Sequence, residues 1–127
     1  MENPSVFFEC TGAKEVCSAL RSAVDDSLEK SGLGNVRNPA RADVSVAAEV
    51  TPMQEKVSRD FGTTFAVRTY SIEISAEARR TSEAVSMPAS TTLSFDPTYG
   101  SERLTEKARL VAAEIAEKIR AFAAKKR

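Results

Sequence analysis

The stretch FGTTFAVRTYSIEISAEAR, residues 61–79, is typical of a β-strand but changes phase in its middle. Its apolar residues stand at odd positions before Arg68 and at even positions after it: first Phe61, Phe65 and Val67, then Tyr70, Ile72, Ile74, Ala76 and Ala78. Because side chains alternate between the two faces of a strand, one straight strand cannot bury both sets on one face. We expect a β-bulge near Arg68-Thr69 to return the first set to the core. The alternative is an exposed apolar cluster on the opposite face.

The segments around this stretch complete a β-α-β-β-β-α order. Residues 5–10 are β-prone, and residues 43–50 alternate between apolar and polar side chains, as half-buried strands do. Residues 53–60 are polar and charged and predict a connection, whereas residues 85–95 predict a last strand that Pro88 confines to a sheet edge or a bulge. Apolar residues at helical spacing predict one helix from residue 13 to Gly32 and a longer one from Ser101 onward.

These elements predict an α+β protein folded as a two-layer sandwich. Each helix has one apolar stripe and the strands have one apolar face. Packing both helices on one face of a four-stranded, mostly antiparallel sheet therefore buries every stripe. The 127 residues fit a single domain, 1–127, which can equally be a fragment of a longer protein.

Charge and hydropathy exclude some classes of partner. The chain has 18 basic and 18 acidic residues, so its net charge is zero, which argues against nucleic-acid binding. No apolar run approaches the roughly 20 residues that an integral membrane helix needs. The first residues do not have the pattern of a secretory signal, as expected either of a cytoplasmic protein or of a trimmed, exported one.

The two cysteines and the lack of histidine bear on metal, cofactor and redox chemistry. Cys10 and Cys17 match neither the CxxC spacing nor a zinc-site spacing, and the chain has no histidine to act as a metal ligand. We expect no metal site and no cofactor. We expect both cysteines to be buried as small apolar residues, with a Cys10–Cys17 disulfide as the main alternative.

No group of residues predicts an enzyme. Serine and cysteine have no histidine base available, and the carboxylates Asp25, Asp26, Glu73 and Glu77 fall on predicted solvent-facing surfaces. We therefore expect a protein without catalytic residues.

One part of the chain resembles a module of bacterial envelope proteins. The helix end Leu28-Glu29-Lys30-Ser31-Gly32-Leu33, a loop, then Ala42-Asp43-Val44-Ser45-Val46 and a long strand are similar to the TolB amino-terminal domain, the curli-secretion lipoproteins and the middle domain of the flagellar T protein. The resemblance covers about residues 13–95. This sequence departs from it in having no lipidation cysteine. It implies a periplasmic or outer-membrane-associated assembly module, with a cytoplasmic location as the alternative.

The sequence thus favours a non-catalytic protein-interaction domain. Its partner is another protein or a second copy of the chain, and the contact uses a sheet edge or the surface formed by Phe61, Phe65 and Val67. The alternatives are a domain that holds a small apolar ligand between helices and sheet, and an uncharacterised domain with a cytoplasmic role.

Overall fold

The structure is a computed structural model that describes residues 3–98 and 100–126. In chain order the elements are β1 (Ser5–Gly12), α1 (Lys14–Lys30), β2 (Gly34–Asn35), the 3-10 helix η1 (Pro39–Arg41), β3 (Val44–Asp60), β4 (Thr63–Ala78), β5 (Ala84–Val85), β6 (Thr91–Phe95) and α2 (Ser101–Lys125). Both predicted helices and the first three predicted strands are present, and Gly32 adopts a φ of +73° just after α1 ends.

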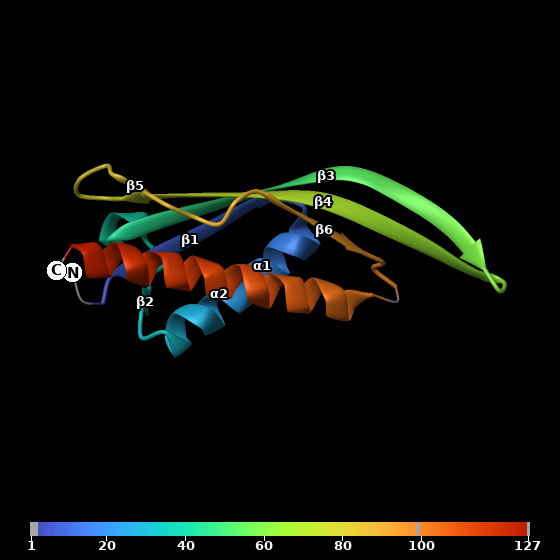
Figure 1. Cartoon of the computed structure of the whole chain (residues 1–127), viewed down its shortest axis with the longest axis horizontal. Coiled ribbons are helices and arrows are strands. Elements are labelled where there is room, and N and C mark those ends of the chain that lie inside the picture. Colours follow the sequence, from blue (N-terminus) through green and yellow to red (C-terminus); the bar gives the residue numbers. More distant parts are fainter. Residues whose placement is uncertain (1–2, 99, 127) are drawn as a thin grey trace.

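One sheet forms the upper layer and both α-helices lie beneath it (Figure 1). The strand order is β2-β1-β3-β4-β5, and β6 also pairs with β4. The fold class and the position of the helices on one face agree with the prediction, but the expected four-stranded, mostly antiparallel sheet is wrong. Within the described residues the sheet has six strands and is mixed, since β1 pairs in parallel with both β2 and β3. Helix α1 crosses over between β1 and β3, which makes those two strands parallel.

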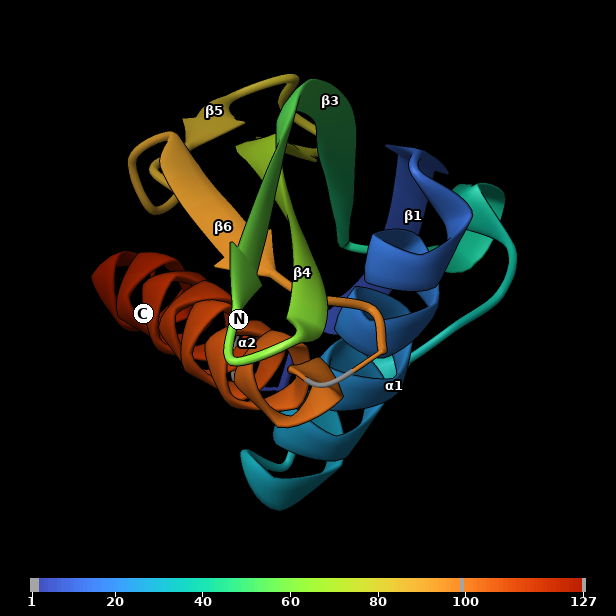
Figure 2. The ribbon, with the colours of Figure 1, turned by 90° about the vertical axis from the view of Figure 1, so that its right-hand side faces the viewer.

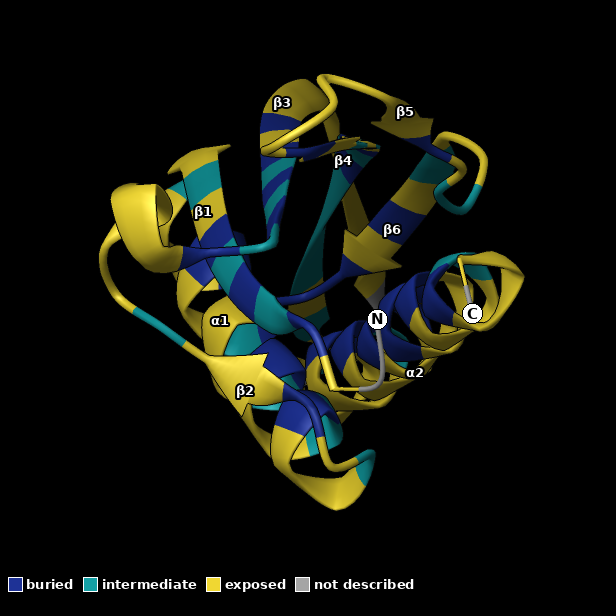
Figure 3. Cartoon of the chain, turned by 90° about the vertical axis from the view of Figure 1, so that its left-hand side faces the viewer, coloured by how far each residue is buried: buried dark blue, intermediate teal, exposed yellow. Residues whose placement is uncertain are grey.

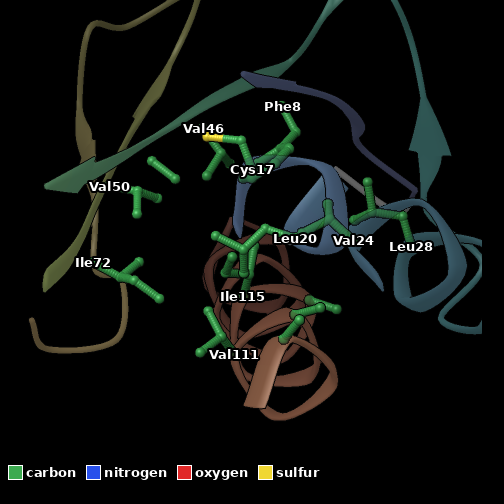
Figure 4. Packing of buried hydrophobic residues seen from close by; sticks show 14 of the residues in the cluster. Phe8, Cys17, Leu20, Val24, Leu28, Val46, Val50, Ile72, Val111 and Ile115 are labelled. Atoms are coloured by element: carbon green, nitrogen blue, oxygen red, sulfur yellow. The ribbon is translucent and has the colours of Figure 1, made fainter. Parts of the chain in front are cut away.

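The core lies between the two layers. Its largest buried side chains come from the inward stripe of each helix and from the inward positions of β1, β3 and β4, among them Leu20, Leu28, Ile115, Ile119, Val6, Val46 and Ile72. Figure 4 shows Leu20, Leu28, Ile115, Val46 and Ile72 between the sheet and the helices, and buried residues cover the inward surfaces of the helices and strands (Figure 3). The alternation predicted for residues 43–50 is confirmed, because Val44, Val46, Ala48 and Val50 are all buried.

Strands β3 and β4 form a hairpin much longer than the sequence predicts. They pair without interruption from Val44 opposite Ala78 to Asp60 opposite Thr63, apart from one register shift between Pro52 and Gln54. The prediction of a connection over residues 53–60 is therefore wrong. Residues 51–59 are all exposed, so neither face of this part of the strand shows the apolar alternation that identifies a half-buried strand.

The bulge lies on the strand opposite the one in which we expected it. The extra residue is Met53 in β3, across from Thr69 and Tyr70, and β4 itself continues without a break. The alternation of β4 therefore places Phe65 and Val67 on the face opposite to Tyr70 and the core. Both residues are half-buried and neither belongs to the core cluster, so the expected return of this set to the core is wrong.

The last predicted strand is divided. In place of one strand over residues 85–95 the structure has β5, which pairs with Ala76 and Glu77, and β6, which pairs with the segment from Arg68 to Ile72. Pro88 lies in the gap between the two strands, where a residue without an amide hydrogen leaves no ladder bond unmade.

Gly12 allows β1 to pass against β3, which gives a test of the fold. Its φ is +108°, and a Cβ at this position would lie 1.9 Å from the Val50 carbonyl oxygen. We expect Gly12→Ala to lower the free energy of unfolding by about 3 kcal/mol in urea denaturation, since both strain and a backbone clash result.

Gly32→Ala is the matched control. Gly32 also has a positive φ, but a Cβ added there would meet no atom within 4 Å apart from those of its chain neighbours. It should lose only about 1 kcal/mol, the cost of the left-handed backbone alone. Equal losses at the two glycines would contradict the close β1–β3 approach.

Candidate functional site

The outer part of the β3–β4 hairpin stands apart from the two-layer body. We call residues 51–67 the arm. Strand β1 pairs with β3 only as far as Val50, and β6 pairs with β4 only from Arg68. Within the described residues, each strand of the arm therefore has the other as its sole ladder partner. The arm extends beyond the ends of both α-helices (Figure 1), and it points toward the viewer in Figure 2.

The arm exposes apolar side chains. Met53 is 58% exposed, Val57 is 64% exposed and Phe61, at the turn, is 99% exposed. Among the described residues, Leu110 of α2 is the one other large hydrophobic residue with comparable exposure. Soluble domains seldom gather exposed apolar residues on one projecting segment without a partner to cover them.

A polar cluster connects the base of the arm to α1. The Tyr70 hydroxyl donates a hydrogen bond of 2.8 Å to the Glu15 carboxylate in the first turn of α1. The Arg68 guanidinium lies 3.5 Å from the same carboxylate and 3.7 Å from that of Glu55 in β3. The Tyr70 ring also stacks on Phe95, with 5.7 Å between ring centroids. The arm is thus held to the helix layer at its base.

The environment of Tyr70 raises the pKa of its phenol. Burial is the largest cause, and the hydrogen bond to the Glu15 carboxylate together with its negative charge adds to the effect, while Arg68 opposes it. The neutral phenol therefore keeps its hydrogen bond to Glu15 across the physiological pH range.

A second contact fixes β4 to the turn before α2. The Asp96 carboxylate accepts a 3.0 Å hydrogen bond from the Ala66 amide and a 2.8 Å hydrogen bond from the Thr98 amide. Asp96 is only 8% exposed, and its two oxygens serve as acceptors for one amide of β4 and one amide of the turn. The inner end of the arm is therefore anchored to α1 and to the turn before α2.

The two cysteines form a disulfide, so the expectation of two unpaired apolar thiols is wrong. Cys10 lies near the end of β1 and Cys17 in the first turn of α1, with their Cα atoms 5.4 Å apart. The tight β1–α1 turn brings the two Cα atoms into the range that a disulfide spans. The bond links β1 to the helical turn that carries Glu15, and thereby supports the contact with the arm.

The structure separates the three predicted contact residues. Phe61 is at the tip of the hairpin with a φ of +49°, whereas Phe65 and Val67 are half-buried within β4. Sequence reasoning missed Met53 and Val57, because it assigned them to a polar connection. Their four-residue spacing with Phe61 was the available signal, but such spacing also fits a helix.

Other parts of the described chain offer less to a ligand. A cluster of buried core side chains packs between the helices and the sheet, where an apolar ligand was the alternative expectation. An open hollow of about 370 Å³ lies on the outer sheet face, beside Phe7, Pro39, Ala47 and Glu77. No metal-ligating group of three or more residues occurs among the described residues. None of the described helices is both long and apolar enough to cross a bilayer.

The fold is shared with solved structures of bacterial proteins, one of them a lipoprotein. No family model and no curated protein matches the chain. A lipoprotein from Neisseria meningitidis superposes with a TM-score of 0.53 at 12% identity, covering 89% of this chain and 98% of that one. The PelC dodecamer from Paraburkholderia phytofirmans gives a TM-score of 0.54 at 11% identity, covering 92% and 86%. At these identities the likeness concerns the fold alone. The chain thus shares its fold with a solved bacterial lipoprotein, while the finer resemblance to TolB and the flagellar T protein has no counterpart in these two structures.

Reduction of the disulfide should destabilise the protein measurably. The bond closes a loop with a sequence separation of 7, so its loss should lower the free energy of unfolding by about 2 kcal/mol. Urea denaturation with and without dithiothreitol measures this change. The Cys10→Ala/Cys17→Ala variant should be insensitive to the reductant, and an unchanged wild-type midpoint would contradict the bond.

The contact between Tyr70 and Glu15 should appear in the dependence of stability on pH. Because the folded pKa of Tyr70 is raised above 10.0, its contribution is complete below that value and is lost as pH rises through the folded pKa. We expect wild type to lose more stability than Tyr70→Phe when both are denatured across this alkaline range. In Glu15→Gln the pKa of Tyr70 should fall toward 10.0 but stay raised by burial, as phenolate absorbance would show. Parallel alkaline losses in wild type and Tyr70→Phe would contradict the contact.

Proposed function

We propose that this chain is a non-catalytic assembly domain of the bacterial cell envelope that contacts a protein partner through its arm. The observation that carries the proposal is the extension of β3 and β4 beyond the body, with Met53, Val57 and Phe61 exposed along it. The proposal concerns binding alone and assigns the arm no reaction.

Two features of the arm favour a protein partner. Strand edges present backbone amides and carbonyls that a further strand can pair, and the arm has no strand outside its own hairpin among the described residues. Its anchors at Glu15 and Asp96 also hold its base in one position. A held surface loses less conformational entropy on binding than a mobile one, which favours recognition.

Two observations support a location in the periplasm or at the outer membrane. The Cys10–Cys17 disulfide is a bond that persists in oxidising compartments and is rare in the reducing bacterial cytoplasm. The solved structures with the same fold include the lipoprotein from Neisseria meningitidis. The two observations are independent of each other, because one concerns redox chemistry and the other the fold.

The polar groups of the site suit a tether better than a reaction. The Glu15 carboxylate contacts both Tyr70 and Arg68, Arg68 also contacts Glu55, and together these residues connect α1, β3 and β4. A general acid or base would need a proton to exchange near neutral pH, whereas the pKa of Tyr70 moves upward, away from that range.

Site-specific photo-crosslinking in the native host tests the partner contact. A photoreactive residue replacing the fully exposed Phe61 should give a discrete higher-mass product, whether with another protein or with a second copy. The matched control replaces Glu29, which is exposed on α1 away from the arm and should give none. Absence of any product at Phe61, with the protein folded, would contradict the proposal.

Cell fractionation with thiol alkylation tests the compartment. We expect the protein in the envelope fractions with both cysteines protected from alkylation until a reductant is added. Recovery from the cytoplasm with two reactive thiols would contradict an envelope location.

A further inference from the structure

The outer edge of β3 carries a pattern that matches itself when reversed. From Met53 to Phe61 every second residue reads Met53, Glu55, Val57, Arg59 and Phe61, with Val57 at the centre and opposite charges on its two sides. Glu55, Val57 and Arg59 follow the bulge and share one face of the strand by alternation. All three are exposed, and β1 leaves this edge at Val50.

We propose that two copies of this chain associate by antiparallel pairing of their β3 arm edges, centred on Val57. In this register Val57 lies opposite Val57 of the second copy, and Glu55 of each copy lies opposite Arg59 of the other. The register also brings the exposed Met53 level with Phe61 of the second copy. The proposal rests on the proposed function, because it names the partner of the arm.

The match of charges and of apolar side chains favours pairing centred on Val57 over pairing centred one residue to either side. Centring the pair on Lys56 would place two lysines opposite each other and oppose Val57 to Glu55. Centring it on Ser58 would oppose Val57 to Arg59 and Glu55 to Phe61. Like charges directly opposite are destabilising in an antiparallel pair, and a charge opposite an apolar residue gains nothing. The Val57 centre alone joins opposite charges to each other and apolar side chains to each other.

The residues and elements around this edge are consistent with pairing restricted to the arm. Pro52 lies just before Met53, and its missing amide hydrogen ends a ladder on the body side of the arm. The arm extends past both α-helices, so two arms side by side leave the two bodies at opposite ends of the joint (Figure 1). A joint of one strand pair buries little surface, so we expect a reversible dimer that forms with increasing concentration.

Charge reversal tests the register with the intact chain. Sedimentation of wild type from about 10 µM to about 1 mM should show the average mass rising from 13.7 kDa toward twice that value. Arg59→Glu opposes two carboxylates at each end of the joint, and Glu55→Arg opposes two guanidinium groups. Each variant should therefore associate at least about tenfold more weakly than wild type.

Mixing the two variants is the decisive measurement of this experiment. In a mixed pair every introduced charge faces its opposite, so Glu55→Arg mixed with Arg59→Glu should recover association of wild-type strength. Recovery on mixing cannot come from misfolding or from the altered Glu55–Arg68 contact. The register would be overturned if the average mass of wild type stayed at that of one chain at every concentration. It would also be overturned if the mixture associated no more strongly than either variant alone.

Disulfide trapping gives a second readout. Val57→Cys should form a covalent dimer under mild oxidation, because the two introduced thiols face each other at the centre of the joint. Thr64→Cys is the matched control, being exposed on the other strand of the same arm. Equal trapping of the two variants would contradict the proposal. A photo-crosslink from Phe61 to a different protein, with no self-association, would overturn this inference while leaving the proposed function standing.

Discussion

The antiparallel pairing of β3 with β4 is the interaction on which the rest of the structure depends. From Val44 opposite Ala78 to Asp60 opposite Thr63, the two strands form the spine of the sheet. Strand β1 adds to one side of this spine, and β5 and β6 add to the other. The inner half gains its stability from burial against the helices. The outer half has no such cover, so its backbone hydrogen bonds and its anchors hold it in place.

The body and the arm meet at a small set of contacts. The disulfide links the end of β1 to the start of α1, and Gly12 allows β1 to approach Val50 closely. Glu15, in the same helical turn, then accepts the hydrogen bond from Tyr70. On the other side, Asp96 accepts from the Ala66 amide. These contacts fix where the arm leaves the body, and they connect an oxidised pair of cysteines to the position of a proposed binding surface.

The sequence predicts the elements that have one buried face, and it misses the strand residues that are exposed on both faces. Helix stripes such as Leu20 and Leu28, and the alternation from Val44 to Val50, appear in the sequence because one face is buried. Residues 51–59 are exposed on both faces, so the same reasoning mistakes a strand for a connection. The phase change in residues 61–79 does not mark a bulge in β4, because Phe65 and Val67 lie on the face opposite to the core and the register shift is in β3. The cysteine pairing depends on a turn geometry that spacing does not encode. Of the exposed apolar residues of the arm, the sequence singled out Phe61 alone, and only under the alternative in which it is not buried in the core.

The central claim is that β3 and β4 continue as one paired ladder beyond the body, and nuclear Overhauser effects measure this most directly. The account predicts cross-strand contacts between Val57 and Ala66 and between Lys56 and Val67, with Met53 as the unpaired residue of the bulge. Contacts displaced by one residue, or the absence of any contact between the strands beyond Pro52, would contradict it.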